Sequence, residues 1–313
     1  MIATFFTKSN PIHYIFAFVY LSSLFFIKNS QIITGDLNTI VAYFVLLITL
    51  CSSILLIKFI ISKNILNKKN NYGIVAVCFL IGLIIEESIS YRVLFSNIFL
   101  LLALRKIFSL RTPININKKI FDAVFWILIA STFYSPTILF LTLLIVTLLL
   151  YSHFNLNNIL VIIFAIISTI SFLYILEISS HSYSSFFDFI NLLFFEITTN
   201  GYSALFFKQE VVIDFKWSFN FVMIFIFLFL FLCLYVWKGF VKTNERRRST
   251  TLILLTTTLS LIILNLAIPE TFIFLLFSII VVFTTYLERS SSQVIKNLIL
   301  ILCLAAPYFS VLF

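Results

Sequence analysis

Charged residues are scarce in this chain: only 11% of its 313 residues are Asp, Glu, Lys or Arg, whereas 62% are hydrophobic. Soluble globular domains carry about 25% charged residues. The mean hydropathy of +1.14 excludes a water-soluble globule, because the apolar excess needs lipid as its solvent. Glycine and proline, with five residues each, are also too few for a collagen-like, disordered or loop-rich fold.

Cysteine is sparse as well, and no catalytic motif is present. The four cysteines lie singly within apolar runs, without a CxxC pair or a histidine at metal-ligand spacing: Cys51, Cys78, Cys233 and Cys303. We expect them to be buried hydrophobic side chains. The absence of Walker, GxSxG, HExxH, GxGxxG and CxxCH motifs disfavours ATP hydrolysis, serine hydrolysis, zinc proteolysis and covalent haem. No cofactor or metal is expected.

Long apolar runs fill most of the chain, and phenylalanine alone accounts for 40 residues. A spanning helix needs about 20 apolar residues. Eleven runs meet or approach this length: 11–27, 38–62, 71–85, 90–110, 117–133, 135–152, 157–178, 216–238, 249–267, 269–287 and 293–313. The third is short, and the fourth contains Arg92 and Arg105. The sequence therefore predicts an all-α, multi-pass membrane protein with a single domain, 1–313, and an outer loop with an interfacial helix at 179–215.

Three prolines mark expected breaks in these helices. Ser135-Pro136 predicts a tight reversal in which Ser135 caps the following helix, and Pro269-Glu270 repeats the device. Pro307 lies inside the last apolar run, where it predicts a kink or an early end of the helix.

The basic residues gather on alternate connections between the predicted spans. With the N-terminus inside and eleven spans, nearly all Lys and Arg fall on the inner side and most acidic residues on the outer side. The exceptions are Lys28, Arg92, Lys208 and Lys216, and, among the acids, Asp122, Glu245 and Glu288. The positive-inside rule then predicts a multi-pass protein with its N-terminus in the cytoplasm and its C-terminus outside. The net charge of +9 is an orientation signal that also favours anionic cytoplasmic lipid rather than nucleic acid.

Glu86 and Glu87 form the first candidate site, at the outer end of the third span, with Arg92 close behind. Ionisable groups near membrane depth are often functional, and adjacent carboxylates can divide into an acid and a base. The two glutamates are therefore candidate catalytic residues, with Arg92 as a phosphate contact. The alternative is an interfacial cap in which a glutamate pairs with Arg92.

An inner basic cluster forms the second candidate site. Its members, candidate ligands of a lipid phosphate together with Arg92, are Arg105, Lys106, Arg111, Lys118 and Lys119. Lys118 and Asp122 are spaced i,i+4 and can pair at the interface. The alternative is ordinary positive-inside anchoring. His13 and His153, at predicted inner helix ends, are expected to extend toward the interface.

Several segments resemble a known family. They are MIATFFTKSNPI at the start of the chain, LALRKIFSLR at 102–111, KIFDAVFW at 119–126 and ASTFY at 130–134. They resemble a family of polytopic inner-membrane proteins of Bacteroidota of unknown function, some of which are labelled beta-carotene 15,15'-monooxygenase. Carotenoid cleavage enzymes bind iron through four histidines, and this chain has three, so the label is rejected. The resemblance supplies no catalytic residues.

Two functions remain open at this point. The favoured hypothesis is a non-enzymatic subunit or scaffold of a cell-envelope complex for secretion, motility or glycan export. Its expected partners are membrane lipids and a protein of that complex. The alternative is a periplasm-facing enzyme acting on lipid-linked glycans, with Glu86 or Glu87 as base. A transporter ranks third, because the internal repeats and broken helices typical of transporters are missing.

Overall fold

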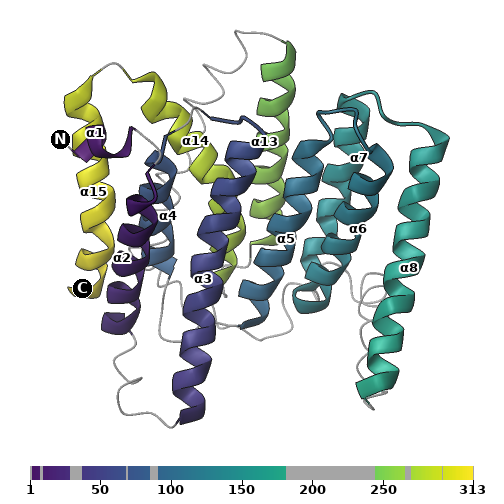
Figure 1. Ribbon diagram of the computed structural model, residues 1–313, viewed down its shortest axis with the longest axis horizontal. Helices are drawn as coiled ribbons and strands as arrows, with labels where there is room; N and C mark the ends of the chain where they lie inside the picture. The colour runs from purple at the N-terminus through teal and green to yellow at the C-terminus, as the bar shows by residue number, and fades with distance from the viewer. Residues whose placement is uncertain are drawn as a thin grey trace. The chain divides into compact units, whose positions relative to one another are not determined.

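The computed structural model describes residues 2–7, 10–28, 37–67, 70–84, 91–180, 244–264, 269–290 and 292–312. In these residues the regular structure is entirely helical, without a strand, which confirms the predicted all-α class. The helices are α1 (Ile2–Phe6), α2 (Ile12–Lys28), α3 (Leu37–Lys63), α4 (Tyr72–Ile84), α5 (Tyr91–Ser109), α6 (Ile116–Phe133), η2 (Ser135–Leu139), α7 (Phe140–Leu150), α8 (Leu156–Ser180), α13 (Asn244–Ile263), η3 (Pro269–Leu275), α14 (Leu276–Arg289) and α15 (Gln293–Leu312) (Figure 1).

These helices follow the apolar runs of the sequence closely, because each run is bounded by polar residues or proline. The run 216–238 and most of the predicted outer loop, 181–215, lie outside the described residues. Within the described part, three stretches are long and apolar enough to cross a bilayer: Phe44–Lys63, Leu156–Ile175 and Thr271–Glu288. Shorter apolar helices accompany them. The chain therefore has the character of a membrane protein, while the count of eleven spans and the side of each terminus stay predictions.

The prolines act differently from the sequence-based expectation. Ser135 does not cap a helix: it is the first residue of the 3-10 helix η2, whose N-cap is Tyr134, and no side chain caps it. Pro269 likewise opens the 3-10 helix η3. A 3-10 turn accommodates a proline in its first positions, where no backbone N–H is needed. Helix α15 continues past Pro307 to Leu312, so the early end considered for this helix is wrong.

The chain separates into two compact units. The first comprises Met1–Leu94, Lys216–Leu261 and Pro269–Phe313, and the second Phe95–Phe215 and Ile262–Ile268. In the first unit α4 packs against α2, α3, η3, α14 and α15, and every side chain from Tyr72 to Leu83 is buried. Helix α4 has 13 residues, fewer than the roughly 20 that a spanning helix needs. Its apolar surface contacts other helices of this unit on all sides, which is one of the two settings of a helix that is hydrophobic around its whole circumference.

In the second unit α5 and α6 form an antiparallel pair. Ser96 Oγ of α5 donates a hydrogen bond to the Ala130 carbonyl oxygen of α6, 2.9 Å away. The rings of Phe99 and Trp126 stack between the same helices with their centroids 5.7 Å apart. Small polar groups and close ring packing are the usual means by which membrane helices associate, because lipid offers no hydrophobic driving force. Helix α8 then packs on α6.

Candidate functional site

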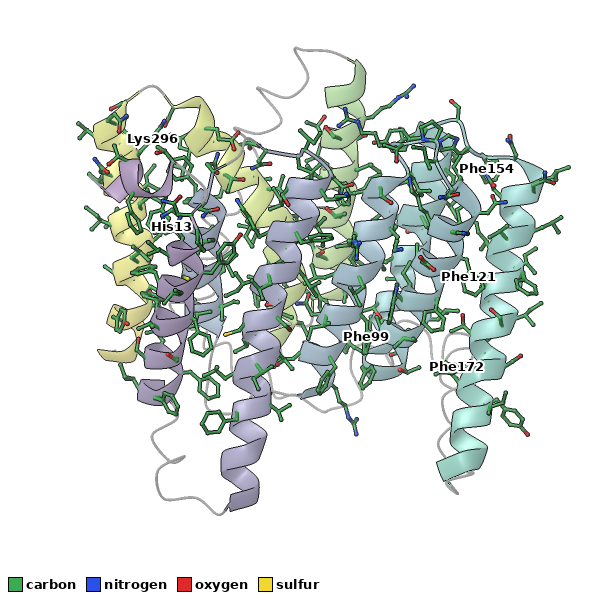
Figure 2. All side chains as sticks on the ribbon, in the orientation of Figure 1. His13, Phe99, Phe121, Phe154, Phe172 and Lys296 are labelled. Atoms are coloured by element: carbon green, nitrogen blue, oxygen red, sulfur yellow. The ribbon has the colours of Figure 1, made fainter. Side chains whose placement is uncertain are left out.

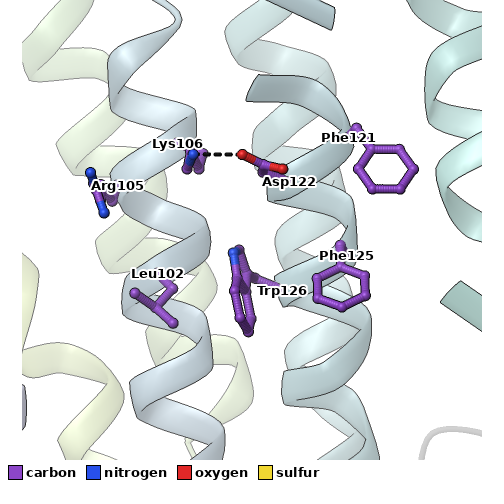
Figure 3. Close-up of a pocket in the computed structure, with 7 residues that line it drawn as sticks. All are labelled: Leu102, Arg105, Lys106, Phe121, Asp122, Phe125 and Trp126. Carbon is purple, nitrogen blue, oxygen red and sulfur yellow. Dashed lines mark hydrogen bonds and ion pairs between the residues drawn. The ribbon is translucent and has the colours of Figure 1, made fainter. Parts of the chain in front are cut away.

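A pocket of about 330 Å³ lies between α5 and α6 in the second unit (Figure 3). It is lined by one aliphatic, three aromatic and three charged side chains: Leu102, Arg105, Lys106, Phe121, Asp122, Phe125 and Trp126. Two of the predicted lipid-phosphate ligands, Arg105 and Lys106, are thus brought to one place. The aromatic side chains that accompany them, Phe121, Phe125 and Trp126, were not predicted as site residues from the sequence.

Helical spacing sorts the pocket into two levels. Lys106 and Leu102 lie four residues apart on α5, and Asp122 and Trp126 lie four residues apart on α6. Residues at i and i+4 occupy the same face of a helix, one turn above the other. Because the helices are antiparallel, Lys106 meets Asp122 at one level, and Leu102 lies near Trp126 at the next, as Figure 3 shows. The pocket is therefore charged at one end and apolar at the other.

An ion pair closes the charged level. Lys106 Nζ donates to Asp122 Oδ2 at 2.5 Å, and the two side chains remain 29% and 38% exposed. The spacing in the sequence suggested Lys118 as the partner of Asp122. The observed partner comes from the neighbouring helix instead, because α5 and α6 pack with these two residues face to face. With Arg105 included, the charged level holds two cations and one carboxylate.

The aromatic level is held by ring contacts on several sides. Trp126 stacks on Phe99 with an interplanar angle of 10°, and it meets Phe125 edge to face at a centroid distance of 5.1 Å. Phe125 in turn contacts Phe172 of α8, and Phe121 contacts Phe164 of the same helix. Figure 2 labels Phe121 and Phe172. Such contacts restrict the rotamers of the wall. The indole of Trp126 is thus fixed beside the ion pair rather than free to rotate.

Lys119 has a different role from its basic neighbours. Its Nζ donates to the carbonyl oxygens of Ser109 at 2.7 Å and Thr112 at 2.9 Å, and to Thr112 Oγ1 at 2.7 Å. These three contacts tie the side chain of Lys119 to the last residue of α5 and to the connection that follows it. Asn115 opens α6 with φ 52° and ψ 45°, a left-handed conformation that asparagine tolerates well. Together they hold the connection that sets α5 against α6.

The remaining predicted ligands do not line the pocket. Arg111 and Lys118 are exposed around the α5–α6 connection, and Arg92 is exposed in the first turn of α5. Glu86 and Glu87 lie outside the described residues. The lipid-phosphate role assigned to the six cations stays a prediction, and the geometry concentrates it on Arg105 and Lys106. The sequence also contained a sign of the other pocket residues. Asp122 and Trp126 are four residues apart in the segment KIFDAVFW, a spacing that puts them on the same face of a helix.

A second polar cluster lies in the first unit, around His13. The ring is fully buried, with Phe5 and Phe6 at centroid distances of 4.4 and 4.9 Å, so the expected extension of His13 toward the interface is wrong (Figure 2). Asn71 Nδ2 lies 2.7 Å from His13 Nδ1 and 3.3 Å from the Asn10 carbonyl oxygen. An amide nitrogen donates hydrogen bonds, so His13 Nδ1 is the acceptor in this buried contact.

A second set of hydrogen bonds, beside Asn71 in the sequence, links α3 to α14. Lys58 Nζ donates to the carbonyl oxygen of Asn70, and Asn70 Nδ2 donates to Glu288 Oε1 at 2.5 Å. These contacts join α3, the segment before α4 and the end of α14. No group of three or more His, Cys, Asp or Glu side chains suited to a metal occurs among the described residues. The hydrogen bonds of Lys58, Asn70 and Glu288 hold the ends of these helices together in the first unit.

Comparisons with models of known protein families, with curated proteins and with solved structures find no match to this chain.

Proposed function

We propose that this chain is a non-enzymatic, multi-pass subunit of a cell-envelope complex in the bacterial inner membrane, and that its α5–α6 pocket holds a phospholipid head group on the cytoplasmic side. The observation that carries the proposal is the exposed apolar face of α8. Only 17% of the stretch Leu156–Ile175 is buried, compared with 89% of Thr271–Glu288. A helix with so much apolar surface left exposed by the described part of the chain needs lipid or another membrane helix beside it.

The uncovered surface of α8 is continuous along the helix. Large apolar side chains on several turns are between 49% and 66% exposed: Leu160, Ile163, Phe164, Ile167 and Ile175. Ala165 and Thr169, four residues apart, are fully buried on the side that faces the protein. A branched aliphatic surface of this length is well suited to packing against a partner helix. This supports the assembly role that the sequence favoured.

The pocket supports the lipid contact. A guanidinium group matches the oxygens of a phosphate with paired donors, and Arg105 and Lys106 lie at the charged end of the pocket. The predicted cytoplasmic position of the α5–α6 connection places this end toward the head groups of the inner leaflet. A bound phospholipid at this position steadies the helix pair to which α8 is packed.

Site-specific photo-crosslinking tests the assembly role. A benzophenone amino acid at Ile163 or Ile167, in the chain expressed at its native level, is expected to form a discrete adduct with another protein in the membrane. Leu149 of α7, which is 55% exposed, provides the matched control in the same unit and is expected to give only lipid adducts. If Ile163 and Ile167 give the same adducts as Leu149, the chain has no partner on α8 and the proposed role is wrong.

A further inference from the structure

We infer that the α5–α6 pocket binds the zwitterionic head group of phosphatidylethanolamine, with the phosphate on Arg105 and Lys106 and the ammonium on Asp122. The inference rests on the proposed lipid contact and names its ligand. It differs from the anionic-lipid expectation of the positive-inside rule, and the carboxylate of Asp122 is the reason.

Both signs of charge lie at the same end of the pocket. Lys106 Nζ and Asp122 Oδ2 are 2.5 Å apart, and Arg105 lines the pocket beside them. A head group with only negative charge would meet the Asp122 carboxylate at close range, and a like charge in a half-buried site is costly. A head group with a phosphate and an ammonium two carbons apart instead gives each protein charge an opposite partner. Lys106 and Asp122 exchange their mutual contact for contacts with the lipid.

The depth of the charged pair suits a lipid rather than a soluble ligand. Asp122 is six residues from Ile116, the first residue of α6, which is about 9 Å along the helix axis. The polar region of one leaflet is about 5–8 Å thick. If α6 begins at the membrane surface, the pair lies at the boundary between head groups and hydrocarbon, and Trp126 lies one turn deeper. The aromatic wall then contacts the glycerol and the first methylene groups, where tryptophan is enriched in membrane proteins.

Because Lys106 and Asp122 are partly exposed, they can replace their mutual contact with contacts to a lipid head group. Side chains that are 29% and 38% exposed reach solvent without rearrangement of the helices. The aromatic wall, by contrast, is fixed by Phe99 on one side of Trp126 and by α8 behind Phe121 and Phe125. A preformed apolar wall beside an exchangeable ion pair binds a head group at a low cost in conformational entropy.

Native mass spectrometry of the full chain, titrated with phosphatidylethanolamine or phosphatidylglycerol, tests the inference. The unaltered chain is expected to bind phosphatidylethanolamine more tightly. Asp122→Asn is expected to weaken this binding about tenfold, the loss of one charge-assisted hydrogen bond, and to leave phosphatidylglycerol binding unchanged or stronger. Lys63→Gln, an exposed change at the end of α3 and outside the pocket, is the control and should alter neither. Soluble phosphoethanolamine should not compete, because it lacks the acyl chains.

A second variant separates loss of the site from loss of the fold. Lys106→Gln combined with Asp122→Asn removes both charges together, so no unpaired ion remains, and it is expected to weaken both lipids while the protein stays monodisperse. A preference for phosphatidylglycerol that Asp122→Asn strengthens would overturn the inference and leave an anionic-lipid pocket in its place. Competition by soluble phosphoethanolamine would overturn the lipid assignment. Neither outcome changes the crosslinking result on α8, which tests the proposed function separately.

Discussion

Gly82→Ala is expected to lower the apparent melting temperature of the detergent-solubilised protein, although alanine is the better helix former. A Cβ atom at this position would lie 2.8 Å from Cβ of Pro307 and 2.9 Å from Cδ1 of Leu24. The proline ring cannot rotate away, so α4 and α15 must separate. Overpacking costs about 1–3 kcal/mol, whereas the gain in helix propensity is about 1 kcal/mol. The net effect is destabilising.

Gly73→Ala is the matched control on the same helix. Its Cβ would meet the Cγ2 methyl groups of Ile280 and Thr284, both at 3.2 Å, so a shift of only a few tenths of an ångström is required of each neighbour. The propensity gain is then expected to leave the melting temperature unchanged or raised. Equal melting temperatures for the two variants would contradict the close approach of α4 and α15. Scanning fluorimetry in a single detergent makes the comparison direct.

Asn71→Ala is expected to destabilise the first unit by about 2–3 kcal/mol. The change removes two hydrogen bonds from a fully buried amide and leaves His13 Nδ1 without its donor. A buried polar atom without a partner costs about 1–3 kcal/mol beyond the bond itself. Asn64→Ala removes only a local bond to the Ile60 carbonyl oxygen on a half-buried side chain, and it is expected to cost about 0.5–1.5 kcal/mol.

A double-mutant cycle with His13→Leu isolates the contact between the two residues. Because the leucine variant no longer needs a donor, Asn71→Ala should cost less in that background than in the unaltered chain. A coupling energy of about 1 kcal/mol or more is expected for residues in direct hydrogen-bonded contact. Strictly additive melting shifts would show that the amide and the imidazole do not depend on each other.

The positions of the helices were predictable because the apolar runs are long and their ends are polar. The run 71–85 became α4 within a residue at each end, despite being too short for a confident span. Its burial was not predictable, since an all-round apolar helix looks the same whether lipid or protein surrounds it. The 3-10 turns at Ser135 and Pro269 were missed because proline at a helix start permits either geometry.

The site was predictable only in part. The cationic segment containing Arg105 and Lys106 was identified, but the spacing rule paired Asp122 with Lys118 on its own helix rather than with Lys106 on α5. Contacts between helices depend on their packing register, which periodicity alone does not give. The position of His13 was predicted wrongly for the same reason. Its buried partner Asn71 is far away in the sequence, and no pattern near His13 indicates that the two residues meet.

Reporter fusions test the membrane position of the α5–α6 pair, on which the proposed lipid site depends. Thr112 lies in the connection between α5 and α6, and Tyr134 lies in the bend after α6. Alkaline phosphatase is active only outside the cytoplasm, and green fluorescent protein fused after Thr112 reports the cytoplasmic side. A fusion after Tyr134 is expected to show phosphatase activity, and a fusion after Thr112 fluorescence without phosphatase activity. Phosphatase activity after Thr112 would place the pocket's charged end at the wrong leaflet and contradict the account.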